Sequence, residues 1–132
     1  MSRNKSREVA FRIGYDINPI KEYDERETLL GVFGINEKID NGFIQELIKA
    51  VVENKAEIDA VIAANLKGFS FERIFPTDLA ALRLGLAEIK YLDGQPEVVI
   101  DAVVTLAKKY GTEKSAGFVN GVLASVNDEK TC

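Results

Sequence analysis

Apolar residues recur every three or four positions along most of the 132-residue chain, which is the period of an amphipathic α-helix. Residues 3–17 place Val9, Ile13 and Ile17 on one helical face. Similar apolar stripes follow at residues 29–33, 44–52, 58–66, 79–89, 99–110 and 119–126. The connections are short, and no strand–turn–strand signal separates the stripes. The pattern therefore predicts an all-α protein of about seven helices.

Residues typical of helix ends separate these stripes. Predicted starts carry Asp24 with Glu27, the Asp40-Asn41-Gly42 turn, Pro76, Pro96 and Ser115, and predicted ends carry Pro19, Gly68 and Gly111. Segment 68–76 is the best candidate for a joint between an N-terminal helical half, 1–68, and a C-terminal half, 76–127. Because nothing there resembles a flexible linker, we expect two small packed bundles in one compact domain over residues 1–132.

Missing residue types exclude several kinds of chemistry. Histidine is absent, and the one cysteine, Cys132, is the last residue. Without histidine there can be no Ser-His-Asp triad, no Cys-His pair and no Cys/His zinc cage. Gly-rich phosphate loops and metal-ligand spacings are also missing. We therefore expect a binding protein that is not an enzyme and holds neither metal nor cofactor.

Hydropathy gives no sign of a membrane protein. The longest uncharged run, residues 115–127, is well short of the roughly 20 apolar residues that span a bilayer. The N-terminus is basic, but the apolar region of a signal peptide does not follow it. The expectation is a cytoplasmic protein without a membrane partner.

Charge is unevenly distributed along the chain. The net charge is −4, yet residues 1–12 alone carry +3, because Arg3, Lys5, Arg7 and Arg12 stand against a single Glu8. The remaining residues therefore carry −7. We call residues 1–12 the basic arm. Charge alone fits either a local contact with a polyanion or a solubilising end.

The first predicted helix carries aromatic residues opposite its apolar stripe. Phe11 and Tyr15 project away from Val9 and are flanked by Arg3 and Arg7. One interpretation is a helix buried on two sides, which we favour for Phe11. The other is a single-stranded RNA contact, in which aromatics stack on bases and arginines pair with phosphates. For Tyr15 both interpretations stay open.

The last predicted helix has a second candidate site at its start. Phe118 lies at the rim of the apolar stripe, close to Lys114 and Ser115. Basic groups beside a helix N-terminus suit an anion, although a rim phenylalanine packed on a neighbour with solvated lysines fits equally well. Gly117 and Gly121 predict a close helix approach, because two helical glycines cost roughly 2 kcal/mol relative to alanine. Asn120 between them is a candidate buried hydrogen-bonding residue.

Three stretches together resemble the NusB transcription antitermination family. They are Asp78-Leu-Ala-Ala-Leu-Arg-Leu-Gly-Leu-Ala-Glu-Ile89, Val98-Val-Ile-Asp-Ala-Val103 and Ala107-Lys-Lys-Tyr-Gly-Thr-Glu-Lys-Ser-Ala-Gly-Phe-Val-Asn-Gly-Val-Leu123. The N-terminal helix, with Arg7-Glu8-Val-Ala10, resembles the arginine-rich first segment of that family. The resemblance covers roughly residues 3–17 and 76–126, and the Gly111–Leu123 stretch is its most specific part.

The resemblance implies an RNA-binding adaptor. The family pairs with the ribosomal protein NusE and binds boxA-type single-stranded RNA in nascent ribosomal RNA transcripts, as part of the antitermination complex on RNA polymerase. By position it implies six RNA-binding residues, Arg3, Lys5, Arg7, Lys114, Ser115 and Phe118. It also implies that Tyr15 and Asp78 lie near the NusE surface. Asn4 and Ser6 dilute the arginine run of the basic arm, so we expect weak RNA binding that NusE strengthens.

Two other functions stay open at this point. The chain could be a NusB-like helical accessory or regulatory module of RNA modification, acting as a detached regulator. Alternatively it could be a protein-interaction module that never contacts RNA. A homodimer that hides the basic arm when NusE is absent is a further hypothesis, motivated by the face that carries Phe11 and Tyr15.

Overall fold

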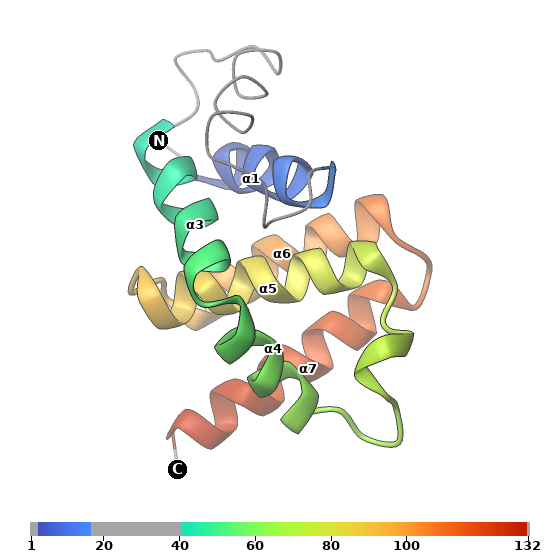
Figure 1. Cartoon of the computed structure of the whole chain (residues 1–132). Coiled ribbons are helices and arrows are strands. Elements are labelled where there is room, and N and C mark those ends of the chain that lie inside the picture. The colour runs from blue at the N-terminus through green and yellow to red at the C-terminus, as the bar shows by residue number, and fades with distance from the viewer. Residues whose placement is uncertain (1–2, 17–40, 132) are drawn as a thin grey trace.

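The computed structural model describes residues 3–16 and 41–131 (Figure 1). Its elements are α1 (Asn4–Asp16), α3 (Asn41–Glu53), α4 (Lys55–Ala64), the short 3-10 helix η1 (Phe71–Arg73), α5 (Pro76–Tyr91), α6 (Pro96–Tyr110) and α7 (Ser115–Thr131). No strand occurs within those two ranges, and the predicted all-α class is confirmed. The helix expected around residues 29–33, with Asp24 and Glu27 at its start, lies outside the described residues.

Helix α5 is the central element of the described fold. It contacts α1, α3, α4, α6 and α7, and Figure 1 shows it crossing the middle of the molecule between α1 and α7. Leu82 and Leu86 are fully buried on it, and each contributes about 1.5–3 kcal/mol through burial. One continuous apolar core joins α5 to these five helices. Because α5 contacts helices from both sides of segment 68–76, the division into two halves stays a prediction.

The close packing of α5 depends on Gly85. A Cβ added at this position would lie 3.1 Å from Cγ2 of Val103 on α6 and 3.3 Å from Cδ1 of Leu123 on α7. Such contacts are tighter than ordinary van der Waals packing, so even alanine would force a neighbour to move. Gly85 is therefore the residue that lets three helices meet in the core.

The glycines of α7 do not have the packing role that their spacing predicted. A Cβ added at Gly117 or Gly121 would meet no atom within 4 Å, so the predicted close helix approach is wrong. Asn120 is exposed, which also corrects its predicted burial. The reason is rotational: α7 turns Val119, Val122 and Leu123 towards the core and leaves the glycine face outside.

Among the described residues, three helix ends follow the predicted signals and a fourth is shifted. Pro76 and Pro96 occupy the first turns of α5 and α6, and Gly111 directly follows α6, as predicted. The fourth predicted helix ends earlier than expected, at Ala64, and Gly68 lies in the turn beyond it. Gly68 has a φ of +65°, a left-handed conformation that favours glycine. This turn leads directly to Phe69, which is 41% exposed.

Candidate nucleic-acid interface

The basic arm is fixed to α5 by a buried ion pair. Nε and Nη2 of Arg7 each donate a hydrogen bond of 2.6 Å to one carboxylate oxygen of Glu88, and Nη1 donates to Oδ1 of Asn4 at 2.8 Å. Arg7 is 6% exposed and Glu88 is 2% exposed. The structure therefore places Arg7 inside the molecule, apart from the exposed cations with which the sequence grouped it.

The turn after α5 closes over this ion pair because residue 94 is glycine. A Cβ at Gly94 would lie 2.9 Å from Cγ of Glu88 and 2.8 Å from Cγ2 of Val99. The N–H of Gly94 donates to the carbonyl oxygen of Glu88 at 3.0 Å. Asp93, with a φ of 56°, makes the left-handed step between helix and turn. The chain thus shields the pair from water, which strengthens the attraction between its charges.

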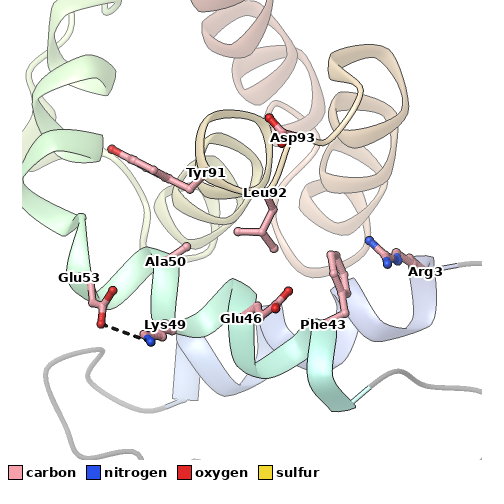
Figure 2. Close-up of a pocket in the computed structure, with 9 residues that line it drawn as sticks. All are labelled: Arg3, Phe43, Glu46, Lys49, Ala50, Glu53, Tyr91, Leu92 and Asp93. Carbon is pink, nitrogen blue, oxygen red and sulfur yellow. Dashed lines mark ion pairs between the residues drawn. The ribbon is translucent and has the colours of Figure 1, made fainter.

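Arg3 and Lys5 are the exposed cations at the start of α1. The guanidinium carbon of Arg3 lies 4.3 Å from the ring centroid of Phe43 on α3, a cation–π contact. Figure 2 shows Arg3 and Phe43 at the edge of a hollow of about 330 Å³. Glu46, Glu53 and Asp93 give this hollow three carboxylates against two cations, so its lining does not suit a phosphate.

A second contact joins α1 to the end of α6. Glu8 accepts hydrogen bonds from Nζ of Lys109 at 2.6 Å and from the hydroxyl of Tyr110. Burial opposes ionisation of Glu8, but these hydrogen bonds and the charge of Lys109 outweigh it and hold the pKa of Glu8 below its ordinary value. The hydrogen bond from Lys109 to Glu8 in turn raises the pKa of Lys109.

Phe11 packs against Tyr110 on the buried side of the contact between α1 and α6. It is 1% exposed, and its ring packs on Tyr110 with the centroids 5.1 Å apart. The predicted two-sided burial of α1 is therefore confirmed for Phe11, and an RNA contact by this residue is excluded. An exposed Phe11 was also a reason to expect a homodimer, and that reason falls away. Tyr15 lies on α1, but its side chain is outside the described residues.

The turn between α6 and α7 is closed by hydroxyl groups. Ser115 is 1% exposed, and its Oγ accepts a hydrogen bond from the N–H of Thr112 at 2.8 Å. The hydroxyl of Thr112 accepts one from the N–H of Lys114 at 3.3 Å. The predicted cap at Ser115 is therefore corrected, because its hydroxyl lies inside the first turn and reaches back. Ser115 holds this turn and does not face solvent.

Gly111 is required by the same turn. A Cβ at this position would lie 2.3 Å from Oγ of Ser115 and 2.7 Å from the carbonyl oxygen of Ala107. Both neighbours are fixed, one by its hydrogen bond and the other by the helix backbone, so neither can move aside. The turn thereby presents Lys114 and the neighbouring Lys108 to solvent.

Phe118 lies one turn into α7 and packs against a residue that the sequence did not single out. The rings of Phe118 and Phe69 are 5.4 Å apart and inclined at 52°. Phe118 is half-buried, whereas Phe69 is 41% exposed. The signal that could have found Phe69 is an aromatic residue directly after Lys67-Gly68, in a turn between helices. The packing interpretation of Phe118 is therefore confirmed, and the anion site beside it stays a prediction.

Asp78 occupies the first turn of α5 and differs from the other predicted site residues. It is 4% exposed, and its Oδ1 has no hydrogen-bond partner among the described residues. Three residues earlier, Phe75 is 58% exposed. A buried acceptor without a donor costs free energy, which a donor brought by another molecule would recover. This end of α5 is therefore suited to a partner.

The described residues show neither a membrane-spanning helix nor a metal-binding cluster. None of the helices in ranges 3–16 and 41–131 is long and apolar enough to cross a membrane. In the same ranges no three histidine, cysteine or acidic residues gather where they could hold a metal ion.

Comparison with known proteins places the chain in a family. A sequence model of the NusB family matches residues 4–128. The transcription antitermination protein NusB of Listeria monocytogenes serotype 4a (strain HCC23) is 38% identical over 130 residues, which cover 98% of both chains.

Solved structures extend the match to three dimensions. A chain in the crystal structure of a plectonemic RNA supercoil has a TM-score of 0.86 and 31% identity, covering 97% of this chain and 95% of its own length. A chain in the crystal structure of antitermination factors NusB and NusE with double-stranded RNA has a TM-score of 0.84 and 31% identity, covering 96% of both chains. Sequence and fold agree over nearly the whole length, and the chain belongs to the NusB family.

Proposed function

We propose that this protein is a transcription antitermination factor that pairs with the ribosomal protein NusE and binds boxA-type single-stranded RNA in nascent ribosomal RNA transcripts. It would act in the cytoplasm within the antitermination complex on RNA polymerase, by binding and not by catalysis. The observation that carries the proposal is the contact of Glu8 with Lys109 and Tyr110. It fixes α1 to the end of α6, directly before the turn that presents Lys114 and Phe118, and one RNA strand would run over both.

Six residues divide between contact and support in this proposal. Lys5 and Lys114 are exposed cations that would meet phosphates, and Phe118 would stack on a base. Arg3 would meet a phosphate on its exposed side, outside the carboxylate-lined hollow. Arg7 and Ser115 are buried and would position these contacts, Arg7 by fixing the arm and Ser115 by fixing the turn before α7. This division assigns fewer phosphate contacts than the sequence implied.

A separate surface would serve NusE. The exposed ring of Phe75 offers apolar area to NusE, and a rearrangement of the first turn of α5 on binding would bring a donor to the buried, unpaired Oδ1 of Asp78. Tyr15, named by the resemblance, is assigned to the same partner. RNA and NusE would therefore use different side chains, Phe118 on α7 for RNA and Asp78 on α5 for NusE.

The experiment that tests the function is a titration of fluorescently labelled boxA-type RNA, followed by anisotropy, with and without NusE. We expect weak binding by the protein alone and tighter binding when NusE is present. An RNA of scrambled sequence measures the contribution of charge alone. If boxA-type RNA does not bind even with NusE, the proposal fails and an interaction module without RNA takes its place.

A further inference from the structure

The hollow beside Phe118 has features of a ligand site that the proposed contacts do not use. It has a volume of about 350 Å³ and lies between the turn after α4 and the exposed glycine face of α7. Its lining consists of Asn65, Leu66, Lys67, Phe69, Gly117, Phe118, Gly121, Val122 and Ser125. This volume is roughly ten times the share of one water molecule in the liquid, which is room for a planar ring.

The walls of this hollow are aromatic. The rings of Phe69 and Phe118 meet at 52° instead of stacking face to face, so each leaves part of its face uncovered. Phe69 packs against Phe118 and still has 41% of its surface exposed. An uncovered aromatic face in a hollow is suited to stacking with another flat π-system.

The floor of the hollow is bare backbone. Gly117 and Gly121 have open space where a Cβ would lie, and no packing within the described chain requires them to be glycine. Each glycine costs a helix roughly 1 kcal/mol relative to alanine. Glycine suits a position where a ligand approaches the backbone closely, and a flat ring against α7 would make that approach.

One edge of the hollow is held by hydrogen bonds, and its lining has no negative charge. Asn65 donates a hydrogen bond to the carbonyl oxygen of Val61 at 2.8 Å and accepts one from the hydroxyl of Ser125 at 2.8 Å, which joins the end of α4 to α7. The lining includes Lys67 and no carboxylate, in a chain with 21 acidic residues. The hollow beneath Arg3, by contrast, has three carboxylates. The hollow beside Phe118 therefore combines aromatic walls with a purely positive lining.

We propose that this hollow binds one base of the single-stranded RNA, held between Phe69 and the Gly117–Gly121 backbone and next to the base that stacks on Phe118. Lys67 and Lys114 would meet the phosphates on either side of it. The inference rests on the proposed function and names a further binding residue, Phe69, and the glycine floor. A nucleotide of the RNA matches this lining because its planar base suits the aromatic walls and its phosphate suits Lys67.

The test compares RNA affinity among variants of the full chain with NusE present. Phe69→Ala removes one wall and should weaken binding about 5- to 150-fold, the range expected for one base–aromatic stack. Gly121→Leu fills the hollow and should weaken binding to a similar extent, while the helix has space for the new side chain. Val98→Ala, at another exposed apolar residue on α6, should leave affinity unchanged. Thermal unfolding checks that each variant is folded.

A base analogue locates the occupied position. With 2-aminopurine placed at single positions of the RNA, one position should change fluorescence with the wild-type protein and lose that change with Phe69→Ala and with Gly121→Leu. At a second position the fluorescence change should depend on Phe118 and should be retained with Gly121→Leu.

The outcomes separate this inference from the proposed function. If wild-type protein binds boxA-type RNA but Phe69→Ala and Gly121→Leu bind it within twofold of wild type, the hollow takes no base and the proposed function stands. If Phe69→Ala alone weakens binding, Phe69 merely supports the ring of Phe118 and the inference is overturned. If Gly121→Leu weakens NusE binding and not RNA binding, the occupant is a protein and the inference is likewise overturned. If the wild-type protein does not bind boxA-type RNA, the inference and the proposed function both fail.

Discussion

Arg7 and Glu88 stand 81 positions apart in the sequence and form a two-pronged ion pair in the core, with both nitrogen–oxygen distances at 2.6 Å. Removal of one partner would leave a buried charge without compensation, which typically costs 3–5 kcal/mol. We therefore expect Arg7→Ala to lower the free energy of unfolding by about that amount. Urea denaturation measures it, and Arg3→Ala, at an exposed site, should change stability by less than about 1 kcal/mol.

The double variant Arg7→Met with Glu88→Leu distinguishes a supporting role of Arg7 from a direct contact between Arg7 and RNA. Replacing both charges by apolar residues leaves no unpaired ion, so most of the lost stability should return. If Arg7 acts only by fixing the arm, this variant should bind RNA within about threefold of wild type. A folded double variant that has lost RNA affinity and part of its salt dependence would make Arg7 a phosphate contact after all.

The ion pair between Arg7 and Glu88 could not be predicted from the sequence, although the helices that carry it could. The apolar period placed α1, α3, α4, α5, α6 and α7 correctly, because burial of one face dictates that period. The period could not predict that Arg7 is buried, because hydropathy alone assigns an arginine to the surface when its partner is unknown. Glu88 inside the apolar stripe of α5 was the available signal, and pairing it with Arg7 needs a contact between distant segments.

The candidate site was predictable to a similar degree. Lys114 and Phe118 were found from their spacing at a helix start, and the structure places both at the surface, Phe118 in part. Phe69 was missed because it comes from another helix connection and meets Phe118 only through the fold. The cost of Gly117 and Gly121 to a helix marks them as unusual, but the packing within the chain that this cost predicts is absent at both positions. Local patterns identify unusual residues, whereas tertiary contacts decide what those residues touch.

The Glu8 contact should make stability depend on pH. The folded state lowers the pKa of Glu8, so its contribution is present above the ordinary glutamate pKa of about 4.3 and is lost as pH falls through the folded value. Glu8→Gln should therefore be less stable than wild type at pH 7, and the difference should shrink below about pH 4. Unfolding curves measured from pH 7 to pH 3 check this. A difference that stays constant across that range would show that charge on Glu8 is irrelevant.

Two glycines on either side of Ser115 should respond in opposite directions to the same substitution. Gly111→Ala places a Cβ against Oγ of Ser115 and should destabilise the protein by about 1–3 kcal/mol. Gly117→Ala meets open space and should stabilise it by up to about 1 kcal/mol through helix propensity. Thermal unfolding of both variants decides the matter. Equal effects from the two would mean that the turn before α7 is not held as described.

Salt dependence can count the phosphate contacts. Three exposed cations, Arg3, Lys5 and Lys114, predict a slope of log affinity against log salt of roughly −2, at about −0.7 for each contact on single-stranded RNA. If the hollow beside Phe118 binds a base, Lys67 adds a fourth contact and brings the slope to roughly −3. Lys114→Ala should reduce the slope by about 0.7, whereas Phe118→Leu should weaken binding without changing it, because stacking releases few counterions. Anisotropy titrations at several salt concentrations provide the slopes. A Lys114→Ala slope equal to that of wild type would remove this residue from the interface.

Asp78 should matter for NusE and not for the stability of the free protein. Its Oδ1 is buried and unpaired, so Asp78→Asn should leave the free energy of unfolding unchanged or raise it slightly. If NusE supplies a donor to this oxygen, loss of the charged acceptor should weaken NusE binding roughly tenfold to a hundredfold. Glu97→Gln is the matched control, because Glu97 is an exposed acid in the first turn of the neighbouring helix α6. Calorimetric titration of NusE into each variant distinguishes them. Equal affinities for Asp78→Asn and Glu97→Gln would place the partner elsewhere and leave the unpaired oxygen as a cost that the fold itself tolerates.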